Sequence, residues 1–179
     1  MPYLSRLLGA ISIIVVGAEG AELRSGPPDI PVMAVFERLK ALAGTWQGRS
    51  TKGWTDRVTI QVIAAGSAVL FDSFDAHPNE RMLTLVHPDG GRLLLTHYCV
   101  AGNQPRLVLS HVEEDGQLLR FAFLDGANLP TRDKGHMDSL VLRLVDADRF
   151  TERWTWYQDG NESWMEEIEM QRLAGAATP

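Results

Sequence analysis

Residues 80–113 read ERMLTLVHPDGGRLLLTHYCVAGNQPRLVLSHVE, and this stretch contains three runs rich in Val, Leu and Thr. Two clusters of turn-forming residues separate the runs, Pro88-Asp89-Gly90-Gly91 and Gly102-Asn103. Apolar residues at every second position are typical of a strand with one buried face, and Asp-Gly steps favour tight hairpin turns. The segment therefore predicts three consecutive strands joined by hairpins.

The same period of two extends in both directions, from Thr45 to Leu173, with turn residues about every ten positions. Ten strands are predicted, over 45–52, 55–64, 68–75, 80–87, 91–100, 105–113, 117–125, 137–145, 149–157 and 163–173. Only the connection 126–136, GANLPTRDKGH, is long. Consecutive hairpins without helices form a meander, and closing the meander removes its exposed edges. We therefore predict an all-β fold, an antiparallel up-and-down β-barrel.

Before Gly44 the period is that of a helix. Val32, Val35, Phe36, Leu39 and Leu42 recur at helical spacing, with charged residues on the opposite face, and Gly44 ends the pattern. The preceding stretch is a Pro-rich linker over 22–31, and 174–179 is predicted to be a flexible tail. One domain, over 32–173, is expected to contain the helix and the barrel.

The first 21 residues differ in kind from the rest. Met1–Arg6 carries one positive charge and no acidic residue, and Leu7–Val16 is almost wholly apolar. Ten apolar residues are too few to cross a bilayer, which takes roughly 20, but they suit the core of an export signal. We therefore expect a cleaved signal peptide over 1–21, a mature protein that is periplasmic or secreted, and no integral membrane segment after cleavage.

Charge and composition exclude several classes of function. The net charge of −6 argues against binding to nucleic acid, which requires a basic face. A single cysteine, Cys99, allows no internal disulfide. Phosphate-binding loops, dinucleotide fingerprints, nucleophile elbows and zinc-protease motifs are missing from the sequence.

Several short motifs resemble a known group. Gly44-Thr45-Trp46 resembles the Gly-x-Trp signature of lipocalins and related calycin barrels, and Arg172 stands where those families place an arginine over the tryptophan. The segments LAGTWQG (42–48), THYC (96–99) and GNQPR (102–106), together with Gly160, resemble an uncharacterised bacterial lipocalin-like family. That family often has a second histidine where this chain has Asp138. The resemblance implies that the helix closes the end of the barrel at Trp46.

With that end closed, the turns can be assigned to the two ends of the barrel. Successive turns of a meander alternate between the ends, so 52–54, 76–79, 101–104, 126–136 and 158–162 are expected at the open end. On the fifth predicted strand, Leu95, His97 and Cys99 share the face that we predict to be inward. His97, Cys99, Arg106 and His136 are then expected to meet at the mouth.

These positions predict a binding site for a small, mostly apolar ligand with a polar or acidic head. Trp156 and Trp164 would contact the apolar body, whereas His97, Gln104, Arg106 and His136 would contact the head. Arg106 offers a planar fork to a carboxylate or phosphate, or alternatively pairs with an acidic residue such as Asp138. The predicted ligand-binding residues are His97, Cys99, Gln104, Arg106, His136, Trp156 and Trp164.

An enzyme is the alternative, with His97 or His136 as general acid or base and Glu152 or Glu166 assisting. Cys99 with His136 is a candidate nucleophile and base, although no oxyanion donor is identifiable. His97, His136 and Asp138 are acceptable metal-ligand types, but their spacing matches no metal motif. The sequence thus predicts no metal site and no cofactor, while leaving haem or a metal ion open.

Overall fold

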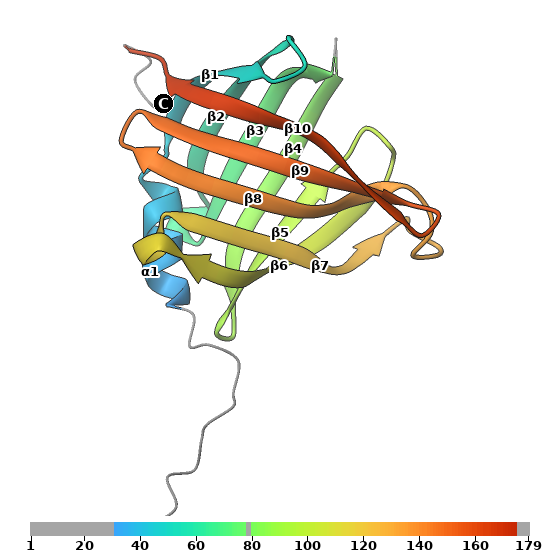
Figure 1. Cartoon of the computed structure of the whole chain (residues 1–179). Coiled ribbons are helices and arrows are strands. Elements are labelled where there is room, and N and C mark those ends of the chain that lie inside the picture. The colour runs from blue at the N-terminus through green and yellow to red at the C-terminus, as the bar shows by residue number, and fades with distance from the viewer. Residues whose placement is uncertain (1–30, 78–79, 175–179) are drawn as a thin grey trace, which may run out of the picture.

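Ten antiparallel strands close into a barrel, and one helix lies against one end (Figure 1). The computed structural model describes residues 31–77 and 80–174, with side chains described for all of these except 75–77, 164 and 166. The helix is α1 (Val32–Lys40), and the strands are β1 (Gly44–Ser50), β2 (Thr55–Ile63), β3 (Ala68–His77), β4 (Glu80–Asp89), β5 (Arg92–Tyr98), β6 (Gln104–Glu113), β7 (Leu118–Ala127), β8 (His136–Asp146), β9 (Arg149–Gln158) and β10 (Asn161–Arg172).

Each strand pairs with its neighbours in sequence, and β1 pairs with β10 to close the barrel. The prediction of a ten-stranded up-and-down barrel with one short N-terminal helix is therefore confirmed. The predicted hairpin at Asp159-Gly160 is a two-residue turn in which both residues have positive φ, 51° and 77°. This is the backbone that a type I′ turn requires, and it matches the twist of the flanking strands. The predicted signal peptide over 1–21 lies outside the described residues, as do almost all of the linker and the tail.

The helix covers the end of the barrel at which β1 begins. Val35, Phe36 and Leu39 are fully buried, whereas Glu37 and Arg38 are exposed, so the apolar stripe of α1 faces the barrel. At Gly116, in the turn between β6 and β7, an added Cβ would lie 3.0 Å from the guanidinium of Arg38. The polar face of the helix therefore contacts the turns that rim this end. Among the described residues, no helix is long and apolar enough to span a membrane.

The closed end is held together by Trp46 on β1 and Arg172 on β10, which are register partners. The Arg172 guanidinium lies over the Trp46 ring, 4.2 Å from its centroid. The same guanidinium donates hydrogen bonds to the carbonyl oxygens of Ala43 (2.8 Å) and Ala147 (2.9 Å), and Trp46 Nε1 donates to the Leu42 carbonyl at 2.8 Å. The first strand, the last strand and the end of the helix are thus tied at one point.

Gly44 is required at this point for two reasons. Its φ is +141°, which side chains rarely adopt, and an added Cβ would lie 2.7 Å from Nη1 of Arg172. The glycine of the Gly-x-Trp sequence thus admits the arginine to the face of Trp46.

Removing the arginine should open this end. We expect Arg172→Ala to lower the free energy of unfolding by about 2 kcal/mol, because carbonyl oxygens lose their donors and Trp46 loses its cation. Denaturant unfolding monitored by tryptophan fluorescence measures the change. Arg149→Ala removes an exposed pair with Asp146 and should leave the midpoint nearly unchanged. Equal effects of the two substitutions would contradict the role given to Arg172.

Candidate functional site

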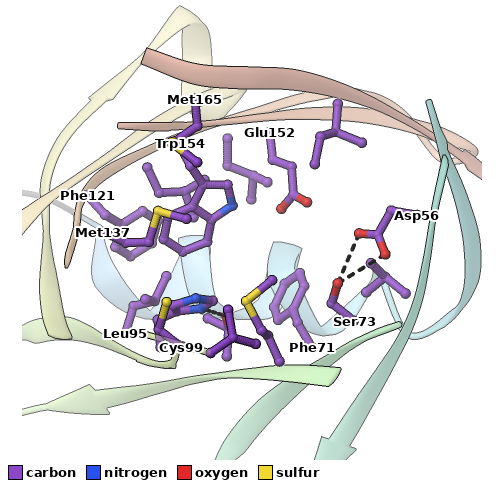
Figure 2. A pocket seen from close by; sticks show the side chains of 18 of the residues that line it. Asp56, Phe71, Ser73, Leu95, Cys99, Phe121, Met137, Glu152, Trp154 and Met165 are labelled. Atoms are coloured by element: carbon purple, nitrogen blue, oxygen red, sulfur yellow. Dashed lines mark hydrogen bonds between the residues drawn. The ribbon is translucent and has the colours of Figure 1, made fainter. Parts of the chain in front are cut away.

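The barrel encloses a cavity of about 500 Å³ (Figure 2). Leu39 of α1 lines it from the closed end, while Trp54 and Ala101 line it from turns at the opposite end and Glu80 from the start of β4. The cavity therefore extends to the end that turn counting predicts to be open. Apart from Leu39, its apolar wall consists of Trp54, Val58, Phe71, Met82, Val86, Leu95, Val100, Ala101, Phe121, Met137, Leu140, Leu142, Trp154, Trp156, Met165 and Ile168. Its remaining lining residues are Asp56, Ser73, Glu80, Thr84, His97, Cys99 and Glu152.

His97 lies on the cavity wall, as the alternation of β5 predicts. Only 5% of its surface is exposed, and its ring packs against the Trp154 ring with the centroids 4.8 Å apart. Its Nδ1 is 2.9 Å from the Thr84 hydroxyl oxygen, on the residue directly opposite in β4. Its Nε2 is buried and has no hydrogen-bond partner among the described residues. One polar atom of the cavity wall thus has unused hydrogen-bonding capacity.

Burial sets the charge of this histidine. Desolvation lowers the pKa of His97 to about 4, because an imidazolium in these surroundings would lose its hydration. At neutral pH the ring is therefore uncharged, with one nitrogen as a donor and the other as an acceptor.

Cys99 also lines the cavity, near its mouth. Burial raises the pKa of its thiol, and the nearby Glu80 carboxylate adds to the shift. A thiol that resists ionisation is a poor nucleophile. The turn that follows Cys99 is closed by backbone hydrogen bonds from Gly102 N to the Cys99 carbonyl and from Cys99 N to the Asn103 carbonyl.

Carboxyl groups supply most of the remaining polarity of the cavity. Asp56 on β2 is 1% exposed and accepts hydrogen bonds from the Ser73 hydroxyl, at 3.1 Å to Oδ1 and 3.0 Å to Oδ2. Figure 2 shows the carboxyl groups of Asp56 and Glu152 both directed into the pocket. Glu80 belongs to the lining as well.

The predicted aromatic contacts are only partly described. Trp156 lines the cavity, and its Nε1 donates to Gln158 Oε1 at 3.3 Å. Gly135 makes room for this indole, since an added Cβ would lie 2.4 Å from Cζ2 of Trp156. The side chain of Trp164 lies outside the described residues, and so does that of Glu166.

The GNQPR motif does not line the cavity, so its two predicted ligand contacts, Gln104 and Arg106, lie elsewhere. Arg106 is exposed and forms a two-pronged salt bridge with Asp125 on β7, which lowers the pKa of that carboxyl group. The acidic partner considered for Arg106 thus exists, but it is Asp125 and not Asp138. Gln104 Oε1 accepts a hydrogen bond from Asn128 at 2.8 Å. The expected meeting of Arg106 with His97 at the mouth is wrong.

His136 is not part of the cavity either. Its ring is fully buried and packs against Phe123 and Tyr157, with centroids 4.7 and 5.6 Å away. Nδ1 donates to the Lys134 carbonyl at 2.6 Å, and Nε2 therefore accepts from Arg132 Nη1 at 2.6 Å. The expectation that His136 meets Cys99 across the mouth is wrong.

A β-bulge explains the error. Met137 pairs with Trp156 and Ser139 with Thr155, so that Asp138 is an extra residue in β8. An extra residue reverses the alternation of side chains on that strand. Met137 consequently lines the cavity together with Leu140, while His136 contributes to a different cluster.

That second cluster holds the connection between β7 and β8, and we call it the loop clamp: Asn103, Phe123, Arg132, His136, Asp138 and Tyr157. The Arg132 guanidinium lies over Tyr157, 3.7 Å from the ring centroid, and donates to Asp138 at 2.5 Å. Asn103 Nδ2 donates to the Gly135 carbonyl at 2.8 Å. Asn103 of the GNQPR motif and His136 thus both help to hold the connection between β7 and β8.

Sequence reasoning missed Asp56, Ser73 and Thr84 in the cavity wall. The alternation of Asp56 with Val58 and Ile60 places its carboxyl group on the buried face of β2. Thr84 likewise alternates with Met82 and Val86 on β4. In both strands, the alternation of buried and exposed positions was enough to predict that these side chains point inward. No group of three or more His, Cys, Asp or Glu side chains in the described part of the chain is arranged to hold a metal ion.

Comparison with known proteins assigns no family to this chain. No protein-family model matches the chain, and no curated protein matches it. A solved structure of a protein of unknown function from the DUF3598 family of Nostoc punctiforme is similar, with 13% sequence identity and a TM-score of 0.48. The match covers 75% of this chain and 49% of that one, so this chain spans about half the length of its structural neighbour.

The state of His97 should be visible in the pH dependence of stability. Its folded pKa of about 4 lies below the ordinary value of 6.5, so the unfolded chain takes up the proton first as the pH falls. The contribution of His97 to the free energy of unfolding is therefore fully present above pH 6.5 and is lost towards pH 4. Over this range the wild type should lose about 3 kcal/mol more than a variant without the histidine. Unfolding of wild type and His97→Gln at both pH values tests this, and a ring titration midpoint near 6.5 by NMR would refute it.

The loop clamp can be tested separately. Arg132→Ala leaves buried atoms of His136 and Asp138 without a donor, and we expect a loss of about 2 kcal/mol. Hydrogen exchange of residues 128–136 should accelerate, whereas Arg106→Ala, which removes an exposed pair, should leave it unchanged. Unaltered exchange in Arg132→Ala would show that the loop is held by other contacts.

Proposed function

We propose that this protein is an exported, lipocalin-like binding protein that holds a small, mostly apolar ligand inside the barrel, with its polar head near the mouth. One observation carries the proposal: a neutral histidine with an unpartnered Nε2 faces a largely apolar cavity of about 500 Å³. An unsatisfied buried polar atom costs about 1–3 kcal/mol, and a small movement of the ring that brings Nε2 to a ligand would remove that cost.

The form of the cavity supports the same function. Ligand sites are typically concave, apolar and supplied with a few polar groups that orient the ligand, and their volumes run from about 300 to 1,000 Å³. Here the apolar wall includes Trp154, Trp156 and Phe121, whose broad faces offer contact area to an apolar body.

The chemistry of the histidines favours binding over catalysis. A general base works best when its pKa lies near the working pH, and burial lowers the pKa of His97 to about 4. His136, the other candidate base, already accepts a hydrogen bond from Arg132 at its Nε2. Neither ring is thus well prepared to take a proton from a substrate at neutral pH.

We include export in the proposal because residues 1–21 resemble a signal peptide, with a short apolar core after Arg6. A periplasmic or secreted carrier of apolar molecules would shield them from water.

The binding function is tested with N-phenylnaphthylamine, a neutral apolar dye whose fluorescence rises on leaving water. We expect saturable binding with one site per chain. Met137→Trp, which narrows the cavity, should weaken binding by about tenfold or more, equivalent to roughly 1.4 kcal/mol. Val145→Trp adds the same indole at an exposed position of β8 and serves as the control. Absence of saturable binding, or equal weakening by both variants, would overturn the proposal.

A further inference from the structure

The two hydrogen-bond partners of His136 in the loop clamp determine the protonation state of its ring. Nδ1 lies 2.6 Å from the carbonyl oxygen of Lys134, which can only accept a hydrogen bond, so Nδ1 carries a proton. Nε2 lies 2.6 Å from Nη1 of Arg132, and a guanidinium can only donate, so Nε2 has a lone pair. Neither partner can exchange its role, as a hydroxyl group could. The arrangement therefore requires a neutral ring with its acceptor at Nε2.

A proton added to Nε2 is incompatible with this arrangement. The protonated ring would present an N–H group to the N–H groups of Arg132 at hydrogen-bond distance. It would also place two cations side by side, at a point where His136 is fully buried. Like charges repel strongly when little water separates them, so one of the two cations has to move away.

Asp138 offers the protonated ring another partner. Its Oδ1 lies 3.5 Å from Nε2 of His136 and 2.5 Å from Nη2 of Arg132, so both basic side chains adjoin the same oxygen. Within the described part of the chain, Arg132 and Asp138 are the charged side chains that contact the ring, and Phe123 and Tyr157 cover it from β7 and β9. A small movement brings an Nε2–H group into a hydrogen bond with Asp138.

Arg132 is the cation that can move into water. Its side chain is 39% exposed, whereas that of His136 has no exposed surface. The guanidinium lies over the rings of Phe123 and Tyr157, 4.4 and 3.7 Å from their centroids, but such contacts are weak where the side chain is exposed. Once Arg132 has left, one cation, His136, is paired with one anion, Asp138.

We propose that the loop clamp is a pH-sensitive switch, in which a proton on Nε2 of His136 displaces Arg132 and frees the connection between β7 and β8. The proton comes from solvent, the hydrogen bond from Arg132 to His136 breaks, and one from His136 to Asp138 forms. Because the released form takes up a proton that the clamped form excludes, a falling pH shifts the equilibrium towards release. Histidine side chains ordinarily change charge between pH 8 and pH 5, and that is the range to test.

The switch lies next to the wall of the cavity. Asn103 Nδ2 donates to the Gly135 carbonyl at 2.8 Å. Gly135 packs against the indole of Trp156, since an added Cβ would lie 2.4 Å from its Cζ2, and both Trp156 and Met137 line the cavity. Release of the connection therefore removes support from the Trp156 side of the wall.

Hydrogen exchange of the ligand-free chain at about pH 7.5 and about pH 5.5 tests the switch, with rates expressed as protection factors to correct for the intrinsic effect of pH. Two amides report on the connection. Lys134 N donates to the Thr131 carbonyl at 3.2 Å. Asp159 N, in the turn between β9 and β10, donates to the Asp133 carbonyl at 2.9 Å. We expect the protection of both to fall by at least about tenfold at the lower pH, as for the loss of one hydrogen bond to a charged group.

Two variants assign the effect to His136. In His136→Gln the amide oxygen can accept from Arg132 at either pH, so we expect equal protection at the two pH values. In His97→Gln, which removes the other buried histidine, the fall at the lower pH should persist. Unchanged protection in the wild type, or a fall that persists in His136→Gln, would overturn the inference.

Arg132→Ala provides a second test that does not alter the histidine. Acid and this substitution break the same contact, so their effects should not add. Protection in Arg132→Ala at the higher pH should already match that of the acidified wild type to within about threefold, and acid should lower it little further. A further fall of about tenfold would show that acid acts elsewhere and would refute the switch. Because no ligand is present, the result does not depend on the binding function proposed above.

Discussion

The stacking of Arg172 on Trp46 is the contact on which the rest of the structure depends. These residues are partners across the β1–β10 seam, where the barrel closes, and the same guanidinium also binds carbonyl oxygens at the end of α1 and in the β8–β9 turn. A meander without this closure would keep two unpaired edges. The same contact lies at the end that α1 covers, and the cavity extends from there to the opposite end.

Two buried histidines show how differently one residue type is used in this barrel. His136 satisfies both ring nitrogens within the loop clamp, where Arg132 and the Lys134 carbonyl determine its tautomer. His97 satisfies one nitrogen through Thr84 and leaves the other without a partner among the described residues. The first arrangement is complete within the protein, whereas the second leaves one buried nitrogen unsatisfied. This difference separates a structural histidine from a candidate binding residue.

The cavity combines features that lower stability with features that suit a ligand. A buried carboxyl group, an unpartnered imidazole nitrogen and about 500 Å³ of unfilled volume would each be disfavoured in a core selected for packing alone. The strands around the cavity are nevertheless continuous, and the barrel seam is tied at the closed end. Such local departures from good packing are typical of functional sites, where surrounding structure maintains them.

The sequence by itself determined the barrel, its strand boundaries to within a few residues, the helix that closes it, and the inward direction of His97 and Cys99. Those features follow from period and turn chemistry, which act between residues close together in the chain. Only the tertiary structure decided which distant side chains meet. The bulge at Asp138 turned His136 away from the cavity, and Asp125 became the partner of Arg106. The pairing of Thr84 with His97, by contrast, follows from the two-residue turn at Gly90-Gly91, which sets the register of β4 and β5. A bulge and the choice of an ion-pair partner depend on the packing of neighbouring strands, and for that reason no local pattern in this chain predicts them.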